Sequence, residues 1–80
     1  MPRLRNLSGA DVVQILRDFG FEPCSQRGSH IKVRRLLAGQ AQSLTVPNHR
    51  EIDRGTLQAI FRQASSFIAE ADLRSRFYTE

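Results

Sequence analysis

The sequence predicts an α+β fold: a helix, three strands forming an antiparallel sheet, a second helix, and a helical extension at the C-terminal end. Three observations predict it. Apolar residues recur at helical spacing near the start of the chain, and again over residues 55–64. Between them lie three short strand-like segments joined by turns. The length of 80 residues predicts one domain over 1–80, with a core at about 4–68 and an extension at about 66–78.

The first helix is expected over roughly residues 9–19. Ser8 can cap its first turn, and Asp11, three residues later, completes the pattern of a capping box. Gly20 is a natural C-terminal stop. Leu7 and Val12 have the spacing of a hydrophobic staple across the helix start. The apolar stripe consists of Val12, Ile15, Leu16 and Phe19.

Three strands are expected over 21–27, 29–37 and 43–46, with turns at Gly28 and at residues 38–42. Pro23 weakens the first strand and suits a sheet edge. Pro47 closes the third strand. Because the connections are short, the sheet should be an antiparallel meander.

Alternation along the second strand separates its side chains into two sets. Ile31, Val33 and Leu37 would point one way, towards two covering helices, whereas His30, Lys32 and Arg34 would point the other way, towards solvent.

Residues 55–64 have a clean apolar helix face, formed by Leu57, Ile60, Phe61 and Ala64. Thr56 or Asp53 could cap this helix. A third, shorter helix is expected within 65–78. Its apolar residues are less regularly spaced, which predicts that it packs loosely or binds a partner.

The composition indicates a basic protein of a reducing compartment. The net charge is +4, and eleven of the twelve cations are arginine, which binds phosphate in a bidentate manner. Eight acidic residues make a solvated, salt-bridged surface an alternative explanation. Cys24 is the only cysteine, so no internal disulfide can form, and a half-buried strand position is expected for it. With neither a secretory signal nor an apolar run of membrane-spanning length, we expect a cytoplasmic protein.

His30 is the principal candidate for chemistry. Histidine changes its protonation near neutral pH and can act as a general base or a general acid. Beside Lys32 and Arg34 it meets the minimum needs of RNA cleavage, in which a ribose 2′-hydroxyl attacks the neighbouring phosphate. The alternative is a surface histidine with no chemical task. Ser29 is a poor nucleophile for His30, since adjacent strand residues point to opposite faces.

Other polar residues are weaker candidates. His49, in the loop after Pro47, could contact phosphate or carry a second proton, although a turn role is the simpler explanation. Arg54 and Thr56 lie where a helix begins, and helix N-termini attract anions. Cys24 and the two histidines lie on three different segments, so we expect no metal site and no cofactor.

The ordered motifs "GSH", "VPNH" and "DRGTLQAIFRQA", with the opening "LSGADVVQILRDFGFE", resemble the HicA family of bacterial type II toxins over about residues 4–68. The resemblance implies a fold like that of double-stranded RNA-binding domains and an mRNA interferase activity. It also implies His30 as the functional histidine, Gly28 and Ser29 as its neighbours in the motif, and a HicB-type antitoxin as partner. The serines at 65 and 66 and the longer tail depart from the family's pattern.

The leading interpretation is therefore an RNA endonuclease toxin that blocks translation without metal. His30 would transfer protons, and RNA would be bound by Gly28, Ser29, Lys32, Arg34, Arg27, Arg54 and Thr56. The alternative is a non-catalytic RNA-binding module that uses the same basic face, and a third interpretation is a structural protein whose C-terminal helix recruits a partner.

Overall fold

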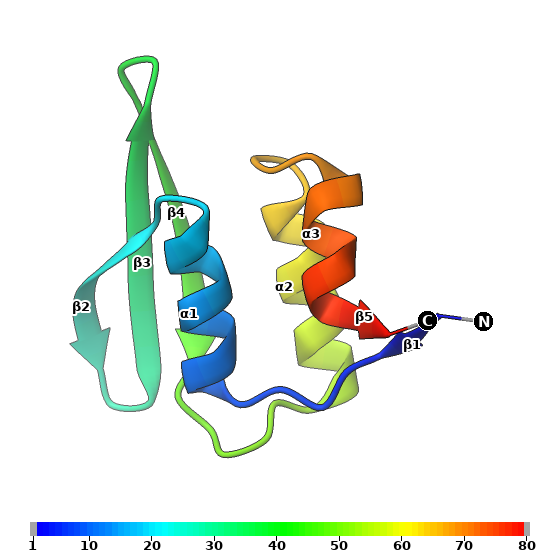
Figure 1. Ribbon diagram of the computed structural model, residues 1–80. Helices are drawn as coiled ribbons and strands as arrows, with labels where there is room; N and C mark the ends of the chain where they lie inside the picture. Colours follow the sequence, from blue (N-terminus) through cyan, green and yellow to red (C-terminus); the bar gives the residue numbers. More distant parts are fainter. Residues whose placement is uncertain (1, 80) are drawn as a thin grey trace.

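The computed structural model describes residues 2–79 and has the predicted α+β architecture. Its elements, in chain order, are β1 (Arg3–Leu4), α1 (Gly9–Asp18), β2 (Glu22–Arg27), β3 (His30–Leu37), β4 (Gln40–Pro47), α2 (Arg54–Ala64), α3 (Glu70–Phe77) and β5 (Tyr78–Thr79). The α-β-β-β-α order and the C-terminal helix are confirmed (Figure 1).

The main sheet is the predicted antiparallel meander, with strand order β2-β3-β4. The third strand is longer than predicted, because β4 begins at Gln40 and only Ala38 and Gly39 form the turn before it. β2 lies at a sheet edge, as Pro23 predicted, and its register with β3 shifts between Pro23 and Ser25. The shift leaves Cys24 without a partner in the ladder. The thiol is exposed, so the expectation of a half-buried Cys24 was wrong.

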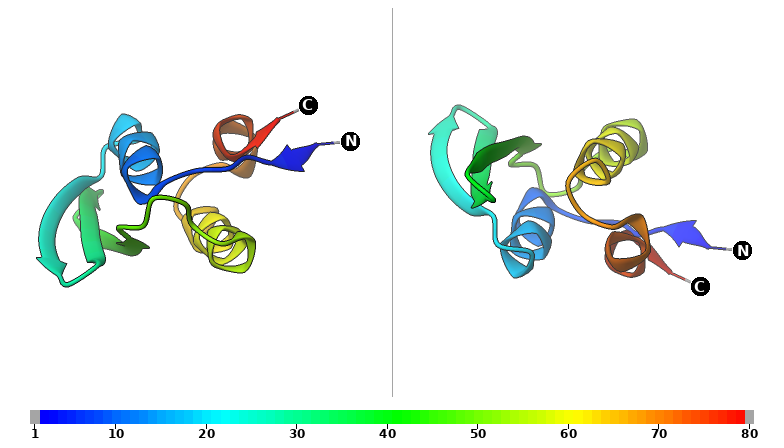
Figure 2. Two further views of the ribbon diagram at one scale, coloured as in Figure 1. Left: turned by 90° about the horizontal axis from the view of Figure 1, so that it is seen from below. Right: turned by 90° about the horizontal axis from the view of Figure 1, so that it is seen from above.

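Helices α1 and α2 lie on the same side of this sheet (Figure 2). α1 packs against β2 and β4, and α2 packs against β4. The predicted apolar stripes face this interface, since Val12, Leu16, Leu57 and Ala64 are buried. From the sheet, the core receives the buried side chains of Val33, Leu44 and Val46. In the part of the chain that the structure describes, no helix lies over the opposite face of the sheet (Figure 2).

Both ends of α1 follow the sequence signals. The Ser8 hydroxyl accepts a hydrogen bond from the Asp11 backbone N–H, and the Asp11 carboxylate accepts one from the Ser8 N–H, each at 3.0 Å. The hydrogen bond from the Ser8 backbone N–H has the largest effect on the pKa of Asp11, followed by the Ser8 side chain, and both lower it below its usual value. At the other end Gly20 has φ +97° and donates to the Arg17 carbonyl, while Phe21 donates to that of Leu16. This is a Schellman motif, which requires the left-handed conformation that glycine adopts easily.

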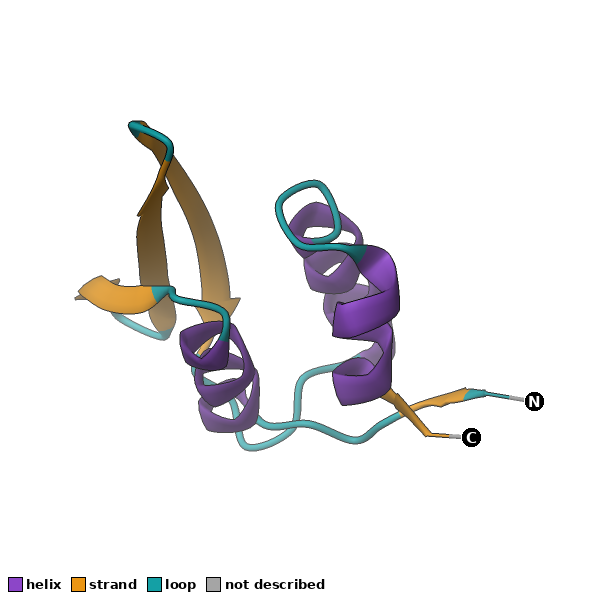
Figure 3. Cartoon of the chain, turned by 45° about the horizontal axis from the view of Figure 1, so that its top comes forward, coloured by secondary structure: helices purple, strands orange, loops and turns teal. Residues whose placement is uncertain are grey.

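The C-terminal extension packs firmly against the body of the protein, and the expectation of loose packing was wrong. α3 begins at Glu70, later than predicted, and lies beside α2 (Figure 3). Leu73 and Phe77 are fully buried. The Phe77 ring meets the Phe61 ring edge-on, with centroids 5.4 Å apart.

A second, two-stranded sheet joins the two ends of the chain and was not predicted. Arg3 pairs with Thr79 and Leu4 with Tyr78 in antiparallel register. Strands of two residues are too short to show an alternating pattern, so the sequence alone could not predict this pairing. Leu4 is buried and anchors the pairing to the core.

Arg35 occupies the core-facing side of β3, where an apolar residue would be expected. Its guanidinium donates hydrogen bonds to the Gln42 side-chain oxygen at 2.6 Å and to the carbonyls of Phe19 and Phe67 at 2.7 Å each. It also stacks over the Phe21 ring, 4.7 Å from the centroid. Leu37, two residues further on, alternates onto the same side of the strand but is 52 % exposed, so it is not part of the core.

We expect Arg35→Met to lower the free energy of unfolding by about 2–3 kcal/mol. The variant removes three charge-assisted hydrogen bonds and leaves two carbonyls without their donor. Urea denaturation would measure the change. Arg34→Met is the matched control, because Arg34 is exposed on the other face, and its effect should stay within about 0.5 kcal/mol. Equal losses in both variants would contradict the proposed role of Arg35 in joining the elements.

Among residues 2–79, no helix has the length and apolar character needed to cross a membrane.

Candidate nucleic-acid interface

His30 is the first residue of β3 and stands directly after a two-residue hairpin turn. Arg27, the last residue of β2, pairs with His30 across this turn, and Gly28 and Ser29 form its tip. Gly28 has φ +54°, a conformation that tight hairpin turns require and that glycine adopts without strain. The turn therefore holds His30 at the end of the sheet, and its side chain is exposed.

The register places cations and hydroxyls beside His30 on the face without a helix. Lys32 is opposite Ser25 on one side and opposite Thr45 on the other. Directly opposite residues in an antiparallel pair project to the same side of the sheet. We call the exposed set Ser25, Arg27, His30, Lys32, Arg34 and Thr45 the basic face.

A shallow depression of about 460 Å³ lies on the basic face. It is lined by Ser25, Gln26, Arg27, His30, Lys32 and Thr45. The imidazole, an ammonium and a guanidinium thus border the same open space. A phosphate group in it would meet two fixed positive charges next to a group able to move protons.

Of the predicted site residues, His30, Lys32 and Arg27 line this depression together. Arg34 lies further along β3 on the same face, since it alternates with Lys32. Sequence reasoning missed Ser25, Gln26 and Thr45. For Thr45 alone the sequence carried a signal, because alternation in the third strand separates Thr45 from the buried Leu44 and Val46.

The loop that follows β4 is fixed against the hairpin turn through the backbone. The Asn48 N–H donates to the Ser29 carbonyl, and the Gly9 N–H donates to the His49 carbonyl at 2.8 Å. A Cβ at Gly9 would come within 2.3 Å of the Pro47 carbonyl oxygen, so only glycine allows this approach. The loop containing His49 and the turn containing Ser29 therefore meet at the same end of the sheet.

The His49 side chain is exposed and does not line the depression at His30. It lies near Asp53, the N-cap of α2. Hydrogen bonds from Thr56 lower the pKa of Asp53 below its ordinary value, and the nearby His49 adds a smaller lowering effect. Asp53, and not Thr56, is thus the capping residue, accepting from the Thr56 N–H at 3.0 Å.

Arg54 and Thr56 are separated from the other predicted site residues. Thr56 is half-buried in the first turn of α2, and Arg54 lines a different depression, together with Arg3 and Arg5. Within residues 2–79, no three side chains of histidine, cysteine, aspartate or glutamate are grouped as a metal site would need.

A family model described as "HicA toxin of bacterial toxin-antitoxin" matches residues 9–65, from the start of α1 to just beyond α2. Comparison with curated proteins and with solved structures gives no match.

Proposed function

The chain belongs to the HicA toxin family of bacterial toxin–antitoxin systems, and on that premise we propose that it is an endoribonuclease that cleaves mRNA and blocks translation. The observation that supports the proposal best is the depression on the basic face, where His30 lies open to solvent beside Lys32 and Arg27. An open site of this kind can admit a polynucleotide, whereas a closed cavity could not.

In the proposed reaction the ribose 2′-oxygen attacks the adjacent phosphorus. The new 2′-O–P bond forms and the P–O5′ bond breaks, which leaves a 2′,3′-cyclic phosphate and a free 5′-hydroxyl. The proton leaves the 2′-hydroxyl and one is delivered to the 5′-oxygen. His30 performs one of these transfers and water the other, which predicts slow turnover. Lys32 and Arg27 stabilise the charge that develops on the phosphoryl oxygens.

The remaining predicted residues would serve binding. Gly28 and Ser29 form the tight hairpin turn and would let the RNA approach the protein backbone closely there. Arg34 extends the positive charge along β3, where it can contact phosphates of the RNA. His49 would assist only if RNA bends over the end of the sheet. A HicB-type antitoxin with an acidic surface would inhibit the toxin by covering the basic face, through occlusion and charge together.

The reaction predicts a definite result with modified substrates. Purified protein should cleave a defined RNA in the presence of a chelator, and a single 2′-deoxy substitution at the cleaved position should abolish that cut, because the nucleophile is gone. Mapping of the product ends should show a cyclic phosphate and a 5′-hydroxyl.

Two outcomes would refute this chemistry. Cleavage that disappears in chelator would require a metal ion, and equal cleavage of the 2′-deoxy substrate would require an external nucleophile. Tight RNA binding without any cleavage would instead support the alternative of a non-catalytic RNA-binding module.

A further inference from the structure

A second cationic depression, of about 540 Å³, lies away from the basic face. It is lined by Arg3, Leu4, Arg5, Asn6, Arg54 and Thr79. The pairing of β1 with β5 brings the two ends of the chain together here, beside the start of α2. β1 and β5 lie on the opposite side of the molecule from β2 and β3, beyond α2 and α3 (Figures 1 and 2).

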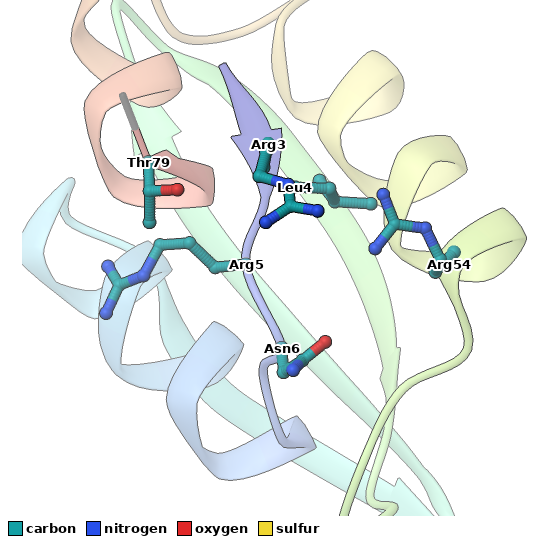
Figure 4. A pocket seen from close by; sticks show the side chains of 6 residues that line it. All are labelled: Arg3, Leu4, Arg5, Asn6, Arg54 and Thr79. Carbon is teal, nitrogen blue, oxygen red and sulfur yellow. The ribbon is translucent and has the colours of Figure 1, made fainter. Parts of the chain in front are cut away.

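Two guanidinium groups face each other across this depression. Figure 4 shows the side chains of Arg3 and Arg54 turned towards one another. The side chain of Asn6 also lines the depression. Arg5 extends in another direction and donates a hydrogen bond to the Arg76 carbonyl at 3.1 Å. Arg3, Arg54 and Asn6 thus form the part that is free to bind.

The charge of this cluster is not neutralised within the described part of the chain. Among residues 2–79 the two ion pairs are Arg17 with Glu22 and Arg76 with Asp18, and neither involves Arg3 or Arg54. The carboxylate next to Arg54 in sequence, that of Asp53, accepts from the first turn of α2 and does not line the depression.

This arrangement favours a bound anion. Like charges that converge repel each other, and Arg54 also stands at the first turn of α2, where the helix dipole disfavours cations. A phosphate between the two guanidinium groups would reverse both effects, because guanidinium groups bind phosphate in a bidentate manner and helix N-termini attract anions.

We propose that Arg3, Arg54 and Asn6 bind a backbone phosphate of the same RNA that the basic face holds, at a point far from the cleaved bond. The proposal rests on the proposed function for the identity of the polyanion. RNA fits better than a protein partner, since the lining is polar, its one apolar residue, Leu4, is buried, and it offers none of the aromatic anchors that dominate the centres of many protein interfaces.

The position of the cluster predicts a dependence on RNA length. The longest extent of the molecule is 38 Å, and each nucleotide of a stacked strand advances by roughly 3.4 Å along the helix axis. An RNA of roughly 4 nucleotides would cover the depression at His30 alone, whereas one of roughly 20 nucleotides exceeds the whole molecule. Only the longer RNA could contact both sites.

The test compares the double variant Arg3→Gln/Arg54→Gln with wild type, using fluorescence anisotropy with 2′-O-methyl RNA, which has no free 2′-hydroxyl. For the longer RNA we expect roughly tenfold weaker binding and a salt dependence whose slope falls by about 0.7 for each lost phosphate contact. Binding of the short RNA should be unchanged. Arg50→Gln/Arg62→Gln removes the same charge from exposed positions, in the loop before α2 and on α2, and is the matched control.

Equal losses in the two double variants would overturn the proposal, since they would show only a general effect of net charge. Unchanged binding of the longer RNA, or a loss confined to binding of an acidic protein partner, would overturn it as well. Cleavage is read separately, with an RNA of the same sequence that carries free 2′-hydroxyls: if it is absent while the length-dependent loss is observed, the phosphate site stands and the nuclease function fails. If wild type binds neither RNA, both proposals fall.

Discussion

Replacing His30 with alanine is expected to abolish growth arrest and to reduce RNA cleavage by roughly 10²–10⁴-fold, the usual contribution of general acid–base catalysis. The imidazole is the only side chain at the depression suited to proton transfer near neutral pH. RNA affinity should fall only modestly, because Lys32 and Arg27 remain. Single-turnover cleavage and anisotropy would measure the two effects independently.

This expectation can be separated from effects on folding. His30 is exposed, and substitutions at such positions usually change the free energy of unfolding by no more than about 0.5 kcal/mol. His49→Ala is the natural control, since it removes the other histidine, which lies outside the depression. If His30→Ala cleaved RNA as fast as wild type, the basic face would be a binding surface only.

Replacing Phe77 with alanine should cost about 3–5 kcal/mol in the free energy of unfolding, as for other large core aromatics. The Phe77 side chain is fully buried and packs edge-on against Phe61 of α2. Small domains are stable by only about 5–15 kcal/mol, and an 80-residue chain belongs near the lower end. Thermal or urea denaturation would then show that the variant is largely unfolded at 37 °C or at temperatures near it.

Leu36→Ala is the matched control for this loss. Leu36 is 68 % exposed at the hairpin end of β3, and its truncation should have little effect. Phe77 lies outside the segment that matches the family model, so the experiment also asks whether α3 belongs to the folding unit. An unfolding transition unchanged by Phe77→Ala would show that the extension does not contribute to stability.

The sequence predicted the main elements where local chemistry specifies them. α1 was found within one residue at its C-terminal end because Ser8, Asp11 and Gly20 act on the backbone directly. The strand order followed from short turns, and the placement of His30 and Lys32 on the open face followed from strict alternation around Val33.

The missed features depend on contacts between distant parts of the chain. β1 and β5 come from opposite ends of the sequence, and strands of only two residues have no sequence pattern that would predict their pairing. Arg35 looks like a surface cation until the carbonyls of Phe19 and Phe67 are brought to it. Cys24 is exposed because the whole of the edge strand β2 is exposed on both faces, which alternation cannot anticipate.

The candidate site was predicted in part for the same reason. His30 and Lys32 lie close along one strand, so alternation alone grouped them. Arg27, named only among the further RNA-binding candidates, is brought beside them by its pairing with His30. Arg54 was named as a candidate for anion binding, and the residues that line the depression with it, Arg3 and Asn6, come from the other end of the chain. Only the closed fold reveals which charges share a surface.

The irregular edge strand also has a consequence for how molecules of this protein meet one another. A regular edge offers unpaired N–H and C=O groups on which a strand from a second copy can add, and such additions lead to β-aggregation. In β2, Pro23 has no N–H to offer, the ladder is displaced at Cys24, and Arg27 places a charge at the end. The β2 edge of the sheet is therefore a poor seed for self-association by strand addition.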